Sequence, residues 1–211
     1  MTIDGLSPLT DLERDALGEL ANLAMARAAL SLRQMVHAEV LLSVPAVEIM
    51  SPAAAADIVS RPENPSLVAI RQDFSGPFAG RALLIFHETT SLELVRIVVG
   101  RQLSIEDIVD LEDEALAETG NIILNSWVST LANLLKQKLS MSLPMVVRHN
   151  RGQIFDSADA QNAAILFLHI RFDTRQHEIS GYVALMMDIP SIDELRKVIA
   201  HFVASVSRPP A

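Results

Sequence analysis

LGELANLAM (residues 17–25) and LAETGNIIL (residues 116–124) are two stretches of the chain that match in register at an offset of 99. Leucine, glutamate and asparagine occupy the first, third and sixth places of both stretches. Pro45 matches Pro144 at the same offset, and residues 80–100 match residues 181–201 at an offset of 101. Self-similarity at a nearly fixed period indicates an internal duplication.

The two halves of the chain predict the same order of helices and strands from their hydrophobic periodicity. Thr10, followed by Glu13 three residues later, is a capping box and predicts the start of a helix that runs to about Val36. The elements expected after it in the first half are a strand at 38–48, a short helix around 53–56, strands at 66–73 and 80–87, and a helix at 90–99. Those expected in the second half are a helix at 106–138, a strand at 141–149, a looser segment, strands at 163–172 and 178–187, and a helix at 191–204.

This order of elements predicts an α/β (α+β) fold. No linker rich in proline, glycine or serine separates the halves, so we expect residues 1–211 to form one domain. That domain would consist of two internal repeats, at about 8–100 and 106–204, related by a pseudo-twofold axis. We expect one continuous sheet with the two long helices packed side by side on one face.

The outward faces of the two long helices are expected to carry the functional residues. Glu19 and Asn22 lie one helical turn apart on one face. That face is opposite the apolar stripe through Leu17 and Ala24, and Asp15 joins it four residues before Glu19. The second long helix repeats the set with Glu114, Glu118 and Asn121. One Glu-x-x-Asn on a helix surface is ordinary, but two in register, each with a proline after 22 intervening residues, indicate a shared function.

The pattern Asp/Ser-x-x-x-Glu-x-x-Asn-x22-Pro resembles that of the CheC/CheX/FliY family of response-regulator phosphatases. The first copy matches it in full, with Asp15, Glu19, Asn22 and Pro45. The second copy matches it with Glu118, Asn121 and Pro144, and departs from it with Glu114 in the place of Asp or Ser. The resemblance covers essentially the whole chain and implies the duplicated CheC-like fold of that family.

The resemblance implies a cytoplasmic enzyme that hydrolyses the aspartyl phosphate of a CheY-like chemotaxis response regulator. Its catalytic residues would be Glu19, Asn22, Glu118 and Asn121, with Asp15, Glu114, Pro45 and Pro144 in support. Each asparagine would orient the attacking water, and each glutamate would bind a lysine of the receiver domain. A carboxamide suits this task because it donates and accepts hydrogen bonds without carrying a charge. The chain would need no cofactor of its own, because the partner's carboxylates would hold Mg²⁺.

A binding module is the alternative to an enzyme. The same fold could dock on a receiver domain, or on the receptor deamidase CheD, without hydrolysing anything, because a fold by itself does not imply catalysis. FliM, which resembles this fold and lacks the Glu-x-x-Asn residues, is the analogy. If CheD binds, the resemblance points to the segment around residues 154–160.

Composition excludes several other classes of function. The formal net charge of −9 argues against nucleic acid or an anionic membrane surface as partner. No apolar run approaches the roughly 18 residues of a membrane span, and we expect no membrane insertion. Cysteine is absent and the six histidines show no ligand spacing, so we expect no metal site.

Three further residues have structural interpretations. Gly120 within the second long helix, together with Ala21 at the matching place, indicates close packing between the two long helices. The two prolines of the motifs are expected at sheet edges or bulges, because proline has no N–H for a ladder. Asn125, one turn beyond Asn121, is interpreted as an ordinary surface residue.

Overall fold

The first long helix, α1 (Asp11–Val36), begins where the capping box predicts. The backbone N–H of Thr10 donates to Glu13 Oε2 at 2.8 Å, and the N–H of Glu13 donates to Thr10 Oγ1 at 3.2 Å. Two of the backbone donors that a helix start leaves unpaired are thereby satisfied. Arg196 adds a salt bridge to Glu13 at 3.0 Å and donates to the carbonyl of Ser7 at 2.7 Å. These contacts fasten the start of α1 to the last helix.

The computed structural model describes residues 7–36, 39–60, 66–99, 105–150, 153–156, 162–174 and 178–206. Beyond α1, the first half contains β1 (Val40–Met50), α2 (Pro52–Val59), β2 (Ser66–Ser75), β3 (Gly80–His87) and α3 (Glu88–Val99). The second half contains α4 (Ile105–Leu135), β4 (Ser140–Met141), β5 (Met145–Asn150), η1 (Gln153–Phe155), β6 (Ala163–Thr174), β7 (Glu178–Asp188) and α5 (Ile189–Val206). The predicted elements are all present, but the strand expected at 141–149 is wrong as a single strand, because residues 142–144 interrupt it.

The strands form one antiparallel sheet in the order β1-β6-β7-β3-β2-β4, and β5 also pairs with β2. At its centre Leu83 of β3 pairs with Ala184 of β7, the residue 101 positions later in the chain. An approximate twofold axis therefore passes through this pair. Each half gives its first strand to the other half, because β1 pairs with β6 and β5 pairs with β2. The predicted fold class is confirmed, whereas the division into repeats at 8–100 and 106–204 stays a prediction.

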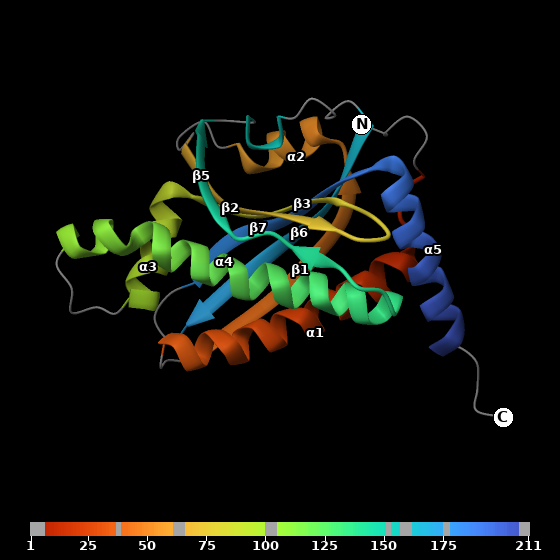
Figure 1. The fold of residues 1–211 in the computed structure, drawn as a ribbon, viewed down its shortest axis with the longest axis horizontal. Coiled ribbons are helices and arrows are strands. Elements are labelled where there is room, and N and C mark those ends of the chain that lie inside the picture. The colour runs from red at the N-terminus through yellow and green to blue at the C-terminus, as the bar shows by residue number, and fades with distance from the viewer. Residues whose placement is uncertain are drawn as a thin grey trace.

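The helices cover the two faces of the sheet unequally. Figure 1 shows α1 and α4 side by side and antiparallel across one face, with α3 and α5 at the two ends of the molecule and α2 on the other side of the sheet. Arg27 Nη1 of α1 donates to Thr130 Oγ1 of α4 at 3.3 Å, which ties the two long helices together. The larger apolar core lies under α1, α3, α4 and α5, and the smaller one lies between the sheet, α2 and η1. Within the described residues, no helix is long and apolar enough to cross a membrane.

Gly120 packs against the sheet and not against α1, so the expected helix–helix contact is wrong at this position. A Cβ at Gly120 would lie 2.5 Å from Cβ of Ile70, which is closer than carbon atoms approach. The missing side chain therefore allows α4 to pack closely against β2. Ala21, at the matching place of α1, is fully buried.

Candidate functional site

The outward face of each long helix carries the predicted polar residues. Glu19 and Asn22 of α1 and Glu118 of α4 are exposed, whereas Asn121 is half-buried. The supporting residues Asp15, Glu114 and Pro45 are exposed, and Pro144 is half-buried. Leu17 and Leu116, on the inward faces, are fully buried. The predicted exposure is thus confirmed except at Asn121, while the catalytic and supporting roles of these residues stay predictions.

Pro45 lies in a bulge of the edge strand β1. Ser43 pairs with Arg171 and Ala46 pairs with His169, so three steps along β1 face two steps along β6. The extra residue breaks the ladder there, as expected for a proline in an edge strand. The backbone N–H of Val44 donates instead to Asn22 Oδ1, at 3.0 Å. The first motif's asparagine is therefore fixed to the bulge that its own proline occupies.

Pro144 lies in a matching irregularity at the opposite edge of the sheet. Met141 pairs with Phe74 and Met145 pairs with Arg71, so four steps along β4 and β5 face three along β2. One extra residue is again accommodated, which is a departure from the continuous strand that the sequence predicts. The placement of both prolines at edge irregularities is confirmed.

Asn121 is held by a different partner from the one that holds Asn22. Gln72 of β2 donates from Nε2 to Asn121 Oδ1 at 3.2 Å and to the backbone carbonyl of Ser142 at 2.9 Å. Gln72 is 1% exposed, so this bridge lies beneath the surface. Its Oε1 atom is buried without a hydrogen-bond partner among the described residues.

Asn125 also contacts Asn121, and its interpretation as an ordinary surface residue is wrong. Its Nδ2 donates to the backbone carbonyl of Asn121 at 2.8 Å and to Asn121 Oδ1 at 2.6 Å. Asn125 is half-buried, one helical turn after its partner. The carboxamide of Asn121 is therefore held from two sides.

Gln72 was not predicted from the sequence, although the sequence holds a signal for it. Val68, Ile70 and Phe74 alternate along β2 toward the larger core, and Gln72 occupies the same face. A lone polar residue in an apolar alternation needs a buried partner, because an unpaired buried amide is unfavourable by about 1–3 kcal/mol. What the sequence could not supply was the partner, 49 positions away on another element.

Acidic and apolar side chains surround both motifs. The four carboxylates at positions 15, 19, 114 and 118 have no ion-pair partner among the described residues. The described residues also contain no cluster of side chains that could hold a metal ion. Leu23 beside Asn22 is 49% exposed, and Leu143 beside Pro144 is 89% exposed. Single exposed leucines are common on protein surfaces and do not by themselves indicate an interface.

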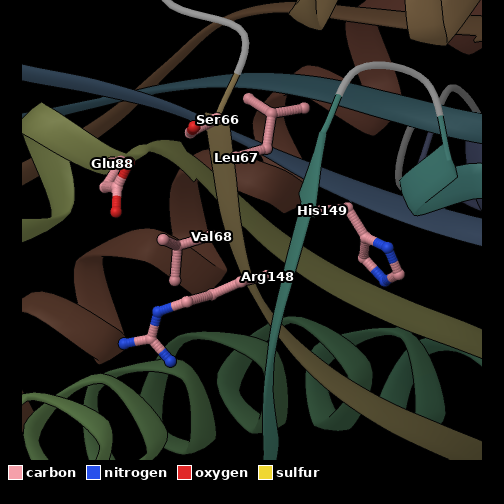
Figure 2. A pocket seen from close by; sticks show the side chains of 6 residues that line it. All are labelled: Ser66, Leu67, Val68, Glu88, Arg148 and His149. Atoms are coloured by element: carbon pink, nitrogen blue, oxygen red, sulfur yellow. The ribbon is translucent and has the colours of Figure 1, made fainter.

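A pocket of about 290 Å³ lies where β2, β5 and α3 meet, away from both motifs. Figure 2 shows Arg148 and His149 on opposite sides of β5, so the polar groups around the pocket do not converge. Arg148 is bound by Asp113 at 2.7 Å and by Glu112 at 3.2 Å. The hydrogen bond with Asp113 raises the pKa of the Arg148 guanidinium above its ordinary value, with Glu112 adding to the effect. The cation therefore already pairs with two carboxylates of α4 and is not free to bind a ligand.

Comparison with known proteins finds curated relatives that include CheC and FliY, although no protein-family profile matches the chain. The CheY-P phosphatase CheC of Bacillus subtilis is 23% identical over 192 residues, which are 87% of this chain and 91% of that protein. The flagellar motor switch phosphatase FliY of the same organism is 23% identical over 146 residues, which are 68% of this chain and 38% of FliY. The matched part is thus well under half of FliY.

Solved structures share the fold. FliY of Thermotoga maritima matches with a TM-score of 0.73 at 16% identity, over 92% of this chain and 98% of that one. FliM of H. pylori, from its complex with SpeE, matches with a TM-score of 0.65 at 11% identity, over 92% and 97% of the two chains.

The fold and the paired motifs together define an α/β protein with one antiparallel sheet and a duplicated polar helix face. Together with curated relatives such as CheC and FliY, they support a protein of the CheC/CheX/FliY type, and the resemblance found in the sequence is confirmed.

Proposed function

We propose that this protein hydrolyses the aspartyl phosphate of a CheY-like response regulator, with Asn22 and Asn121 as the groups that position water. The observation that carries the proposal is the geometry of Asn22. Its Oδ1 is fixed by the Val44 N–H at 3.0 Å while the side chain as a whole remains exposed. A fixed rotamer on an open surface suits a group that must enter another protein's active site, because little conformational freedom is then lost on docking.

The reaction needs positioning more than acid–base chemistry. The water oxygen bonds to phosphorus, the bond from phosphorus to the aspartyl oxygen breaks, and its electron pair stays on the released carboxylate. Both protons of the water leave with the inorganic phosphate. The transition state of such a transfer is loose, so an in-line water is the main requirement. A carboxamide meets it without the repulsion that a carboxylate would have for phosphoryl oxygens.

Glu19 and Glu118 are proposed to bind the lysine that lies beside the phosphoryl group of a receiver domain. Both are exposed, one turn before an asparagine, and have no ion-pair partner among the described residues. The formal net charge of −9 favours approach to a receiver site that presents a lysine and Mg²⁺. Mg²⁺ is assigned to the receiver's own carboxylates and not to this chain.

A protein substrate fits the shape of the surface better than a small molecule. The motifs lie on the outer surfaces of helices, and the pocket of Figure 2 contains none of their residues. Small-molecule sites are normally concave and bury most of the ligand. The name of the relative CheC, a CheY-P phosphatase, supports the same class of substrate.

The direct test is to incubate the protein with a phosphorylated CheY-like receiver and follow the release of inorganic phosphate. We expect the wild type to accelerate release and the double variant Asn22→Ala/Asn121→Ala to lose the acceleration. Asn133→Ala is the matched control, because Asn133 is an exposed asparagine of the same helix α4, outside both motifs. Wild-type activity in the double variant would contradict the assignment of the asparagines.

A non-catalytic adaptor is the second candidate, favoured by the FliM match. FliM of H. pylori shares the fold and is solved in complex with another protein, SpeE. An adaptor would bind the receiver, or CheD, without accelerating phosphate release. Of the segment proposed for CheD, Ile154 and Phe155 are buried, whereas residues 157–160 lie outside the described residues. Tight receiver binding with no acceleration of release would favour this candidate over the enzyme.

A further inference from the structure

The two asparagines differ in how many hydrogen bonds their side-chain oxygens already accept. A carboxamide oxygen has two lone pairs, so it can accept two hydrogen bonds in good geometry. Among the residues that the structure describes, Asn22 Oδ1 accepts one, from the Val44 N–H, and one lone pair remains. That lone pair is what a water needs, because a water that attacks through its oxygen must donate a hydrogen bond to the group that orients it.

Asn121 Oδ1 accepts two hydrogen bonds and has no lone pair left. One comes from Gln72 Nε2 at 3.2 Å and the other from Asn125 Nδ2 at 2.6 Å. The side chain is also half-buried, unlike the exposed Asn22. In this arrangement Asn121 presents only its Nδ2 donors to an incoming receiver.

The orientation of these amides follows from their fixed partners and does not depend on an arbitrary choice between oxygen and nitrogen. The carbonyl of Ser142 can only accept, so the Gln72 atom facing it is the nitrogen. The backbone carbonyl of Asn121 likewise requires the nitrogen of Asn125 to face it. With two nitrogens pointing at one atom of Asn121, that atom must be the oxygen.

The sheet register shows why only the second motif has the buried glutamine. Gln72 pairs with Ala82, and Leu168 pairs with Val183. Ala82 and Val183 are 101 positions apart and so correspond across the twofold axis. Leu168 is therefore the counterpart of Gln72, and it is fully buried within the apolar core. The first motif has a leucine where the second has an amide donor.

We infer that Gln72 and Asn125 are positioning residues that saturate the oxygen of Asn121, so that Asn22 carries most of the hydrolysis. The inference rests on the proposed function and deepens it, because it assigns unequal work to the two motifs. The second motif keeps an exposed Glu118 and so retains the group proposed for the receiver's lysine. It docks a phosphorylated receiver and turns it over slowly.

The first part of the test compares single variants at saturating phosphorylated receiver. Asn22→Ala should lower kcat by about tenfold or more, since losing one well-placed group often removes that much or more. If the two sites were equal, Asn121→Ala would halve kcat. We expect this variant to lose less than half of kcat. Equal losses in the two variants, or a larger loss in Asn121→Ala, would overturn the inference.

The second part seeks a gain of activity, which a merely unfolded variant cannot give. Asn125→Ala removes one donor and leaves Asn121 Oδ1 with one free lone pair, as in Asn22. In the Asn22→Ala background this change should raise kcat severalfold with KM unchanged. Gln72→Leu, which installs the counterpart residue of the first motif, should do the same by freeing the other lone pair. Asn133→Ala in that background is the control and should leave kcat at the level of Asn22→Ala.

The outcomes separate the inference from the function it rests on. Acceleration of phosphate release by the wild type, with no gain from either Asn125→Ala or Gln72→Leu, would reject the inference alone. No acceleration by the wild type would reject the proposed function and the inference together. A gain in kcat in either double variant supports both.

Discussion

The two long helices, α1 and α4, carry the same polar residues outward and differ where they meet the rest of the protein. Two matched positions exchange glycine and alanine: Gly18 corresponds to Ala117, and Ala21 corresponds to Gly120. A Cβ at Gly18 would meet no heavy atom within 4 Å, whereas one at Gly120 would collide with Ile70. The same residue type is thus dispensable in one helix and required in the other.

The first turn of α1 and the matched turn of α4, two turns into that helix, differ in a similar way. Glu13 and Glu112 occupy matched positions, and an arginine binds each of them. Arg196 comes from α5, and the pair that it forms with Glu13 is largely buried, with side chains 17% and 14% exposed. Arg148 comes from β5 and is 43% exposed. The comparison teaches that the outward motif is kept in both halves while each half supports it with contacts of its own.

The largest expected effect is that of Gly120→Ala, which would make α4 match α1 at this position. The added methyl group must displace the branched carbon of Ile70, so we expect a loss of about 3 kcal/mol in the free energy of unfolding. Urea denaturation followed by circular dichroism measures it. A variant as stable as the wild type would show that α4 can move away from β2 without penalty.

Arg196→Met should lower the stability by about 2 kcal/mol at neutral pH, because it leaves the Glu13 carboxylate largely buried without its cation. Arg148→Met is the matched variant. It also leaves a largely buried carboxylate without its cation, because Glu112 is 12% exposed, but Arg148 itself is 43% exposed and its place is open to water. We therefore expect a smaller loss than in Arg196→Met. Denaturation of the three proteins in parallel tests the order. A larger loss of stability in Arg148→Met than in Arg196→Met would contradict this order.

The effect of Arg196→Met should also depend on pH. Burial by itself raises the pKa of the Glu13 carboxyl, but hydrogen bonds from Arg196 and Thr10 outweigh it and hold the pKa below its ordinary value of 4.5. A lowered pKa in the folded state contributes stability that is present above the unfolded value and is lost as the pH falls through the folded one. The difference between the wild type and Arg196→Met should therefore be constant from pH 7 to about pH 5 and shrink below 4.5. The hydrogen bonds from Arg196 to the carbonyls of Ser7 and Pro8 contribute at every pH, so part of the difference should remain. A difference that does not shrink at all below pH 4.5 would show that the Glu13 carboxylate is not its source.

Gly18→Ala should have the smallest effect and the opposite sign. Alanine favours a helix interior over glycine by up to about 1 kcal/mol, and the space at this position is open. We expect a small rise in the midpoint of thermal unfolding. A fall would mean that the neighbours of α1 close in on this position in solution.

Much of the fold could be predicted because its signals are local. The capping box at Thr10, the apolar stripe through Leu17 and the edge placement of Pro45 each depend on residues close in sequence. The contacts that distinguish the two motifs are not local. Gln72 reaches Asn121 from a different strand, and the packing partner of Gly120 is a strand residue 50 positions earlier. Periodicity shows which face of an element is inward, but it does not show which element that face will meet.

The exchange of edge strands between the halves has a consequence for how the chain folds. Within the described part of the chain, β1 pairs with β6 alone, whose residues follow it by more than a hundred positions, and β5 completes the edge beside β2. A chain cut between α3 and α4 would therefore leave β1 with no strand to pair with and α1 over an unfinished sheet. Such distant pairings require a large loop to close, at a loss of chain entropy, before the packing contacts can form. This requirement slows folding. We therefore expect that one motif cannot be isolated by truncation and that the pair forms as a single cooperative unit.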